Sequence, residues 1–322
     1  MDREIATLDH ASTWSNVQQP QSKNVVGSKW LYRIKRKADS SIEKYKARLV
    51  ARGFTQIYGV DYFDTYSLVA QLTTIRYILA MATRHDWNIN TFDFNGAYLN
   101  GELEEGEEIY MKQPPGYEDE TTTVKRLHKS LYGLKQAGRR WYETLCKALE
   151  DLGFRITHAD PGLFLYNSGD NMLILAVHVD DCILTGNSPQ LMNNFKHLIH
   201  EHYTITDLGP IHWILGIKVT HDRSARTLSL SQSSYIDTVL SRFKMASTNP
   251  VGCPMAPGAI FTKDQSPTEA QELDHMCKVP YREAIGSLMY LAVATRPDIA
   301  FSIMTLSQFL NNPGVPHWEG IK

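Results

Sequence analysis

The sequence predicts an α+β fold, and three patterns carry this prediction. Two strand-like runs, residues 29–37 and 44–54, flank the turn "ADSSIE". Two apolar runs flank Asp180 and Asp181, which indicates a second hairpin over residues 172–185. Several other segments place apolar residues at helical spacing. We therefore expect both strands and helices, and we find no internal repeat.

Composition indicates a globular protein with a substantial core. The chain has 322 residues, of which 43% are hydrophobic and 21% charged. No apolar run is long enough to span a membrane, and the N-terminus lacks the pattern of a signal peptide, so we expect an intracellular protein without a membrane partner. The four cysteines are far apart and match neither a zinc spacing nor a disulfide framework, which favours reduced thiols.

Charge is strongly segregated along the chain. The net charge of −2 argues at first against a nucleic-acid partner. However, residues 29–52 hold nine Lys or Arg against two acids, and residues 125–147 hold seven against one. These stripes are compatible with phosphate contact, although the first stripe equally suits a solvent-exposed strand edge that resists aggregation.

The N-terminal half should alternate between short strands and helices. The first 25 residues are polar and weakly patterned. In the strand of residues 44–54, alternation with a period of two puts Lys44, Lys46, Arg48 and Arg52 on one face. Helical spacing then covers residues 73–85, and "NINTFDF" indicates a short strand that ends at Asp93. After an acidic loop, a turn at Gly133 should lead into an amphipathic helix.

The C-terminal half should contain one further strand pair among helices. After the hairpin of residues 172–185 we expect a helix over 189–203 and a strand pair around "HDRSAR". The segment "SSYIDTVLSRFKM" predicts a helix capped by serine. Residues 281–311 predict two helices that are split at "TRPD".

Asp180 and Asp181 require a positive partner if they are buried. An ionised carboxylate is costly to bury, and two side by side repel each other. Taken alone, "VDD" also suits an exposed turn. Asp93 supplies a third carboxylate, and we expect all three on adjacent strands of one sheet. Such a group can hold two Mg²⁺ ions about 3.5 to 4 Å apart, although acids at strand ends also serve as caps and ion pairs.

Eight ordered segments resemble the reverse transcriptase of copia-type LTR retrotransposons. They are "KYKARLVARGFTQ", "DFNGAYLNG", "EEIYMKQPPGYE", "LHKSLYGLKQAGRRWY", "HVDD", "LGIKV", "LSQSSYI" and "IGSLMYLAVATRPDIAFS". The resemblance runs from about Thr13 to the last residue. It implies an RNA-directed DNA polymerase with two Mg²⁺ ions. It also implies a right-hand fold of fingers, palm and thumb, in which an antiparallel palm sheet carries the acidic site.

The resemblance also implies a division of the chain and a set of partners. Residues 1–12 would be a lead-in, residues 13–256 the reverse transcriptase as far as the start of the thumb, and residues 257–322 a helical thumb or connection segment. This segment would lead toward an RNase H domain that this sequence does not contain. The implied partners are dNTPs and an RNA or DNA template with its primer; a homodimer and polyprotein partners such as integrase and RNase H stay open. The implied location is cytoplasmic, in virus-like particles.

Residue by residue, the resemblance assigns three groups of site residues. Asp93, Asp180 and Asp181 would be catalytic and would bind the two Mg²⁺ ions. Nucleotide binding would involve Tyr98, Gln136, Lys46 and Arg48. Template and primer contacts would involve Lys135, Arg139, His178, Leu215 and Gly216. Tyr98 would select deoxynucleotides by excluding a 2′-hydroxyl, although ordinary core packing also explains an aromatic residue there.

Four positions depart from the pattern of the family. His178 replaces the usual tyrosine, Gly138 the usual proline, and Leu68 and Gln71 a proline and an arginine. None of the four is an implied metal ligand. Two functions therefore stay open: an active polymerase module, and a catalytically silent remnant of a decayed element that at most binds nucleic acid.

Overall fold

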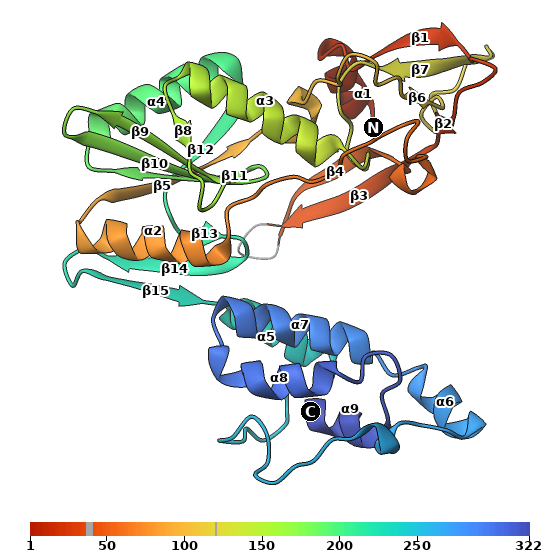
Figure 1. Ribbon diagram of the computed structural model, residues 1–322, viewed down its shortest axis with the longest axis vertical. Coiled ribbons are helices and arrows are strands. Elements are labelled where there is room, and N and C mark those ends of the chain that lie inside the picture. The colour runs from red at the N-terminus through yellow and green to blue at the C-terminus, as the bar shows by residue number, and fades with distance from the viewer. Residues whose placement is uncertain (37–40, 120) are drawn as a thin grey trace. The chain divides into compact units, whose positions relative to one another are not determined.

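The computed structural model describes residues 1–36, 41–119 and 121–322 (Figure 1). The chain forms two compact units, Met1–Ile211 and His212–Lys322. Both units combine helices with strands, so the predicted α+β fold is confirmed. The division predicted between residues 256 and 257 falls inside the second unit.

The first unit is built on a six-stranded sheet in which every neighbouring pair is antiparallel. Its strands, in spatial order, are β12 (Ile205–Pro210), β5 (Asn88–Phe94), β11 (Asp181–Gly186), β10 (Asn171–His178), β9 (Leu163–Ser168) and β8 (Arg155–Ile156). Figure 1 shows α3 (Ala137–Asp151) and α4 (Pro189–His202) on one face and α2 (Leu72–Arg84) on the other. This sheet corresponds to the antiparallel sheet that was expected to carry the acids.

The central strands are apolar because helices cover both faces of the sheet. Residues 173–177 of β10 and 182–186 of β11 are all buried. On the α3 and α4 side, Phe92, Leu175 and Leu184 pack with Trp141 and Leu145 in one hydrophobic cluster. A strand covered on both faces is expected to be a continuous apolar run rather than an alternating one. This explains the two uninterrupted runs that flank the aspartate pair.

A smaller sheet forms from segments far apart in the sequence. Its strands, in spatial order, are β1 (Trp14–Gln18), β7 (Thr123–Leu127), β6 (Tyr110–Met111) and β2 (Val25–Val26). They are preceded by α1 (Asp2–His10), in which Leu8 is fully buried. The weak patterning of residues 1–25 did not indicate β1, because this strand gains its structure by pairing with β7 about a hundred residues later.

A two-stranded ribbon carries the first basic stripe. It pairs β3 (Ser28–Arg36) with β4 (Ile42–Ala51), and we call it the basic ribbon. Leu49 and Ala51 near its base are buried, whereas Tyr45 further along is 75% exposed. Residue 37 of the first predicted strand and residues 38–40 of the predicted turn lie outside the described residues. Two 3₁₀ turns, η1 (Gly53–Thr55) and η2 (Ala97–Asn100), follow β4 and β5.

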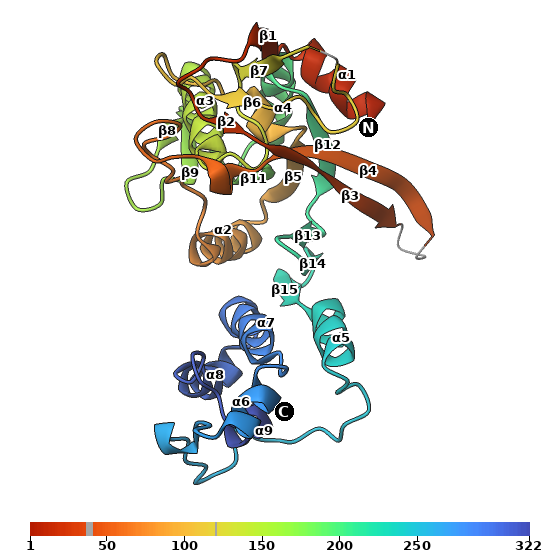
Figure 2. The same cartoon turned by 90° about the vertical axis from the view of Figure 1, so that its right-hand side faces the viewer.

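The second unit combines a small sheet with helices (Figure 2). Its elements are β13 (Trp213–Ile214), β14 (Ile217–Asp222), β15 (Thr227–Ser231), α5 (Ser233–Arg242), η3 (Lys263–Gln265), α6 (Ala270–Met276), α7 (Tyr281–Ala294), η4 (Pro297–Ile299), α8 (Ala300–Ser307) and α9 (Val315–Ile321). The predicted split at "TRPD" is confirmed. The predicted serine cap is wrong, since α5 begins after Gln232 and has no side-chain cap. Among the described helices, none has the length and apolarity needed to cross a membrane.

Candidate active site

The turn between β10 and β11 is short and firmly held. His178 pairs with Asp181 across the hairpin, which leaves Val179 and Asp180 as the two turn residues. Val179 has a φ of 64°, a conformation that is costly for a β-branched residue. The Val179 carbonyl accepts a hydrogen bond from the indole nitrogen of Trp141 at 2.8 Å. The Asp180 carbonyl accepts one from the Phe94 amide at 3.1 Å, so both turn residues are fixed from outside the hairpin.

Strand pairing brings the third carboxylate to this turn. Asp181 on β11 lies directly opposite Asp93 on β5. Residues opposite each other on antiparallel strands have Cβ atoms only about 4.5 to 5.5 Å apart. Asp93, Asp180 and Asp181 line one cavity of about 750 Å³. The structure therefore brings the three predicted carboxylates together.

The neighbouring carboxylates raise the proton affinity of two groups at this turn, Asp181 and Cys182. Burial raises the pKa of the Asp181 carboxyl, and the neighbouring Asp180 carboxylate raises it further. Burial also raises the pKa of the Cys182 thiol well above its usual value, with all three aspartates adding to the effect. A cluster of like charges of this kind favours binding of a cation.

The donor set fits Mg²⁺, which prefers carboxylate oxygens together with water and substrate phosphates. Across residues 1–36, 41–119 and 121–322, however, no three His, Cys, Asp or Glu side chains already have the geometry of a metal site. The three aspartates thus form an open cluster rather than a finished cage, as suits a metal that keeps several non-protein ligands.

The basic ribbon supplies cations to the same cavity. Lys44, Lys46 and Arg48, which the sequence placed on one face of β4, all line it, together with Arg33 of β3. The cavity therefore combines carboxylates from the six-stranded sheet with cations from the ribbon. This charge arrangement suits a ligand that carries both a metal ion and phosphate groups.

Tyr132 is a cavity residue that the sequence did not indicate. The Arg48 guanidinium lies over its ring, 3.7 Å from the ring centroid, and the Tyr98 ring lies 5.1 Å away. Arg48, Tyr98 and Tyr132 line a second cavity of about 300 Å³ with His178, Asp180 and Asp181. Burial raises the pKa of Tyr132 to about 12, so its phenol stays protonated at neutral pH. One sequence signal was available, since Tyr132 precedes Gly133 in the segment "LYGLKQ".

Gly133 explains how Tyr132 reaches the ribbon. It has a φ of 91°, and a Cβ atom built on it would lie 2.2 Å from the Ala51 carbonyl oxygen. Only glycine allows the backbone to pass so close to β4 in this conformation. The Tyr132 carbonyl consequently accepts a hydrogen bond from the Ala51 amide at 2.7 Å.

Gln136 lies behind the cavity rather than in its lining. Its side chain is fully buried, and its amide oxygen accepts a hydrogen bond from the Gln56 amide at 3.0 Å. Its amide nitrogen donates to the Asp61 carbonyl at 2.9 Å. Because both ends of the amide are engaged within the protein, this placement indicates a structural role, in contrast to the expected nucleotide contact.

The second basic stripe contains many ion pairs. Arg139 pairs with Asp64 at 3.2 Å and with Glu143 at 2.8 Å. Arg140 is buried and pairs with three glutamates, namely Glu104, Glu107 and Glu143. Lys135 is exposed, and its ammonium lies 5.6 Å from the centroid of the Tyr62 ring. Of the two predicted template contacts, Lys135 is therefore more open to a ligand than Arg139.

Tyr98 and His178 both lie close to the aspartate pair, and their roles in binding nucleotide and primer stay predictions. Both line the smaller cavity beside Asp180 and Asp181. Burial raises the pKa of the half-buried Tyr98, and the Asp180 carboxylate adds to this effect. The Nδ1 atom of His178 lies 3.3 Å from the Ala70 carbonyl oxygen.

Leu215 and Gly216 belong to the second unit. They form the two-residue turn between β13 and β14, and both have positive φ, 49° and 75°. The hydroxyl of Tyr290 on α7 donates a hydrogen bond to the Leu215 carbonyl at 2.5 Å. The predicted primer-supporting turn is thus attached to a helix of its own unit, and its contact with a primer stays a prediction.

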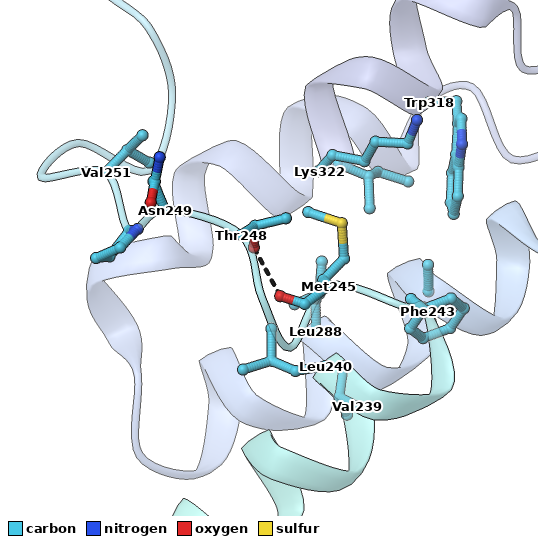
Figure 3. Close-up of a pocket in the computed structure, with 13 residues that line it drawn as sticks. Val239, Leu240, Phe243, Met245, Thr248, Asn249, Val251, Leu288, Trp318 and Lys322 are labelled. Carbon is cyan, nitrogen blue, oxygen red and sulfur yellow. Dashed lines mark hydrogen bonds between the residues drawn. The ribbon is translucent and has the colours of Figure 1, made fainter.

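A separate cavity of about 260 Å³ lies within the second unit (Figure 3). Its wall is mostly apolar and includes Val239, Phe243, Met245, Leu288 and Trp318. Figure 3 shows these side chains grouped between the helices, with the Lys322 ammonium near the Trp318 ring. No carboxylate side chain is among its described lining residues, so it offers no ligand set like that of the aspartate cavity.

Comparison with known proteins settles the family. Residues 11–257 match the family profile described as reverse transcriptase (RNA-dependent DNA polymerase). The chain belongs to the reverse transcriptase family. The copia-type resemblance is confirmed by plant relatives. The retrovirus-related Pol polyprotein from transposon TNT 1-94 of Nicotiana tabacum is 40% identical over 325 residues, and that from transposon RE1 of Arabidopsis thaliana is 39% identical over 330 residues.

These relatives are much longer than this chain. The alignments cover 100% of the chain but 24% and 21% of the two polyproteins. A shorter relative, the putative transposon Ty5-1 protein of Saccharomyces cerevisiae, is 30% identical over 233 residues, which cover 71% of this chain and 72% of that protein. Among solved structures, a foamy viral protease-reverse transcriptase in complex with double-stranded DNA matches 99% of this chain and 46% of that chain, with 12% identity and a TM-score of 0.44.

Proposed function

We propose that this chain is a working polymerase module that extends a primer 3′-hydroxyl on an RNA or DNA template with dNTPs. The observation that carries the proposal is the single cavity lined by Asp93, Asp180 and Asp181 together with four cations of the basic ribbon. Among the possible reactions of phosphate groups, family membership favours the addition of nucleotides to a primer. From the copia-type resemblance we also propose that this activity takes place in cytoplasmic particles.

The three aspartates would hold two Mg²⁺ ions. When bound, such a pair supplies charge stabilisation at the attacking and leaving oxygens of an in-line displacement. The aspartates hold their positions because the hairpin turn is fixed by Trp141 and by the Phe94 amide. Rigid placement of this kind lets the site stabilise developing charge without reorganising.

The ribbon cations would bind the nucleotide, and Tyr98 would select it. Lys46 and Arg48 line the aspartate cavity and would contact the triphosphate, where Arg offers bidentate geometry. Tyr98 lies beside Asp180 in the smaller cavity and would exclude a 2′-hydroxyl from the sugar position. Tyr98→Ala should then admit ribonucleotides, as measured by incorporation of rUTP against dTTP.

The deciding experiment is primer extension on poly(rA) with oligo(dT), Mg²⁺ and dTTP. We compare the parent chain with the double variant Asp180→Asn, Asp181→Asn. Extension by the parent but not by the variant supports the proposal.

The opposite result is equally informative. Silence from both proteins, with folding and hybrid binding intact, would instead identify a catalytically inactive remnant. Equal extension by both proteins would show that the aspartate pair is not the catalytic metal site.

A further inference from the structure

Between β4 and α2 the protein exposes an unusual amount of apolar surface. We call residues 53–66, "GFTQIYGVDYFDTY", the aromatic loop. Six of its large apolar side chains are 50% to 76% exposed: Phe54, Ile57, Tyr58, Val60, Phe63 and Tyr66. Scattered exposed apolar residues are normal, but a group of this size within fourteen residues marks an interaction surface.

Buried polar contacts hold the aromatic loop in place. Gln56 donates to Gln136 at 3.0 Å, and its own amide oxygen accepts from the Lys135 amide at 2.8 Å. Asp61, which is 3% exposed, accepts from the Ile57 amide at 2.8 Å and from Asn24 at 2.5 Å. The loop backbone is therefore tied at its centre, and its rings project from a fixed support. This network also gives Gln136 its structural role.

Both flanks of the aromatic loop are attached beside the smaller cavity. Just before it, the Ala51 amide donates to the carbonyl of Tyr132 at 2.7 Å. Just after it, the Ala70 amide donates to the Val177 carbonyl at 2.8 Å, and the Ala70 carbonyl lies 3.3 Å from Nδ1 of His178. Tyr132 and His178 both line the cavity that contains Asp180 and Asp181. The loop that carries the exposed rings is therefore anchored at both ends next to the candidate active site.

We propose that the aromatic loop is a stacking surface for unpaired bases of the template strand. This inference rests on the proposed function, because that function supplies a single-stranded template beside the cavity. Four of the six exposed side chains are aromatic, and every base has a face that stacks on such rings. Lys135 lies against Tyr62 of the loop and adds a cation that suits the phosphate backbone.

The test separates binding of the overhang from binding of the duplex. The full chain is titrated, without nucleotide or Mg²⁺, with a template-primer that has a 5′ template overhang and with the same duplex made blunt. The variant Phe54→Ser, Tyr58→Ser, Tyr66→Ser should lose roughly tenfold in affinity for each base it no longer stacks, with the overhang substrate only. The matched control is Tyr77→Ser on α2, because the Tyr77 ring is also well exposed, at 69%. This variant should bind both substrates like the parent.

A second readout reports stacking directly. 2-Aminopurine placed in the overhang should be quenched on binding by the parent and by Tyr77→Ser, but much less by the triple variant. Equal loss of affinity for both substrates would overturn the proposal, because it would indicate a general structural effect. Unchanged overhang binding would also overturn it, and if the triple variant then lost self-association in sedimentation, the surface would be a protein interface.

The outcome is distinguishable from failure of the proposed function. If the parent fails to extend a primer yet its overhang binding still depends on the rings, the stacking surface stands and the polymerase proposal falls. If the parent extends a primer and the triple variant binds the overhang normally, only the stacking surface falls.

Discussion

The β10–β11 hairpin and the basic ribbon are both antiparallel hairpins that line one cavity, but they are supported very differently. The hairpin is buried along both strands, and its turn accepts hydrogen bonds from Trp141 and Phe94. The ribbon is buried near its base, at Leu49 and Ala51, and becomes exposed further along.

This difference in support matches two electrostatic roles, metal binding and triphosphate contact. Under the proposed function, carboxylates that bind metal ions need fixed positions, and Asp180 and Asp181 lie at a turn that is held by hydrogen bonds from outside the hairpin. Cations that contact a triphosphate can lie on a more exposed support, because long Lys and Arg side chains adapt to their ligand. Effects of substitution should therefore fall from the hairpin to the base of the ribbon and then toward its exposed part.

The largest effect is expected for Asp181→Asn. Primer extension should fall by at least about a thousandfold, since a metal ion contributes several kcal/mol to stabilising the transition state and each 1.36 kcal/mol is worth tenfold. In EDTA, however, the same variant should be slightly more stable than the parent. The reason is that the carboxylate is partly buried beside Asp180, and both features raise its pKa.

Thermal unfolding with and without Mg²⁺ checks this prediction. Mg²⁺ should raise the melting temperature of the parent more than that of Asp181→Asn, because a ligand stabilises the state that binds it. Asp207→Asn is the control, since Asp207 pairs with Lys196 at 2.8 Å and does not line the cavity. A loss of stability for Asp181→Asn in EDTA would contradict the prediction, because it would mean that the carboxylate stabilises the metal-free fold.

The next largest effect concerns Tyr132, where the ribbon meets the rest of the unit. Tyr132→Leu removes the ring under Arg48, and a cation–π contact is worth about 0.5 to 2 kcal/mol. The KM for dNTP should rise by roughly 2-fold to 30-fold, with a smaller change in kcat. Tyr132→Phe keeps the ring and should behave like the parent.

Steady-state kinetics with varied dTTP measures the split between KM and kcat. Tyr166→Leu is the matched control, because that ring packs against Phe154, 5.4 Å away, and does not line either cavity. A drop in kcat with unchanged KM for Tyr132→Leu would mean that Tyr132 supports the carboxylates rather than Arg48.

The acids could be located from the sequence because their strands are unambiguous. Two apolar runs that flank Asp180 and Asp181 place this pair at the turn of a hairpin. The expectation that Asp93 lies on an adjacent strand of the same sheet is confirmed, and the structure adds that it pairs directly with Asp181. The alternation of Lys44, Lys46 and Arg48 was equally readable, because every second residue of a strand shares a face.

Features that depend on distant segments could not be read in this way. β1 is stabilised by β7, and the position of Tyr132 depends on the close approach of Gly133 to Ala51. Gln136 lies only four residues from Tyr132 in one motif, yet Gln136 is buried whereas Tyr132 lines the cavity. Motif resemblance identifies the segment, whereas the choice of residue within it depends on the local turn of the backbone.

Along the basic ribbon, the effects of substitution should decrease with distance from its base. We expect the KM for dNTP to rise most for Arg48→Met, less for Lys46→Met and least for Lys44→Met, from roughly tenfold down to about twofold. Dissociation constants for dTTP in a stalled complex check the order. Lys29→Met on β3 is the control, because Lys29 lies in the ribbon but does not line the cavity. Equal effects at all three positions would show that only the total charge of the ribbon matters, and not how firmly each position along it is held.

The smallest effect is expected for His178→Tyr, which restores the residue usual in the copia-type family. His178 lines the smaller cavity, and its Nδ1 atom lies 3.3 Å from the Ala70 carbonyl oxygen, which is long for a hydrogen bond. Because the backbone pairing with Asp181 and the turn at Val179 do not depend on that side chain, the carboxylates should keep their positions. Primer extension by His178→Tyr should then lie within about threefold of the parent, since a marginal contact contributes little. If the parent is inactive and His178→Tyr is active, the hairpin turn must be sensitive to one partly exposed ring. The β10–β11 hairpin would then tolerate side-chain changes even less than the basic ribbon does.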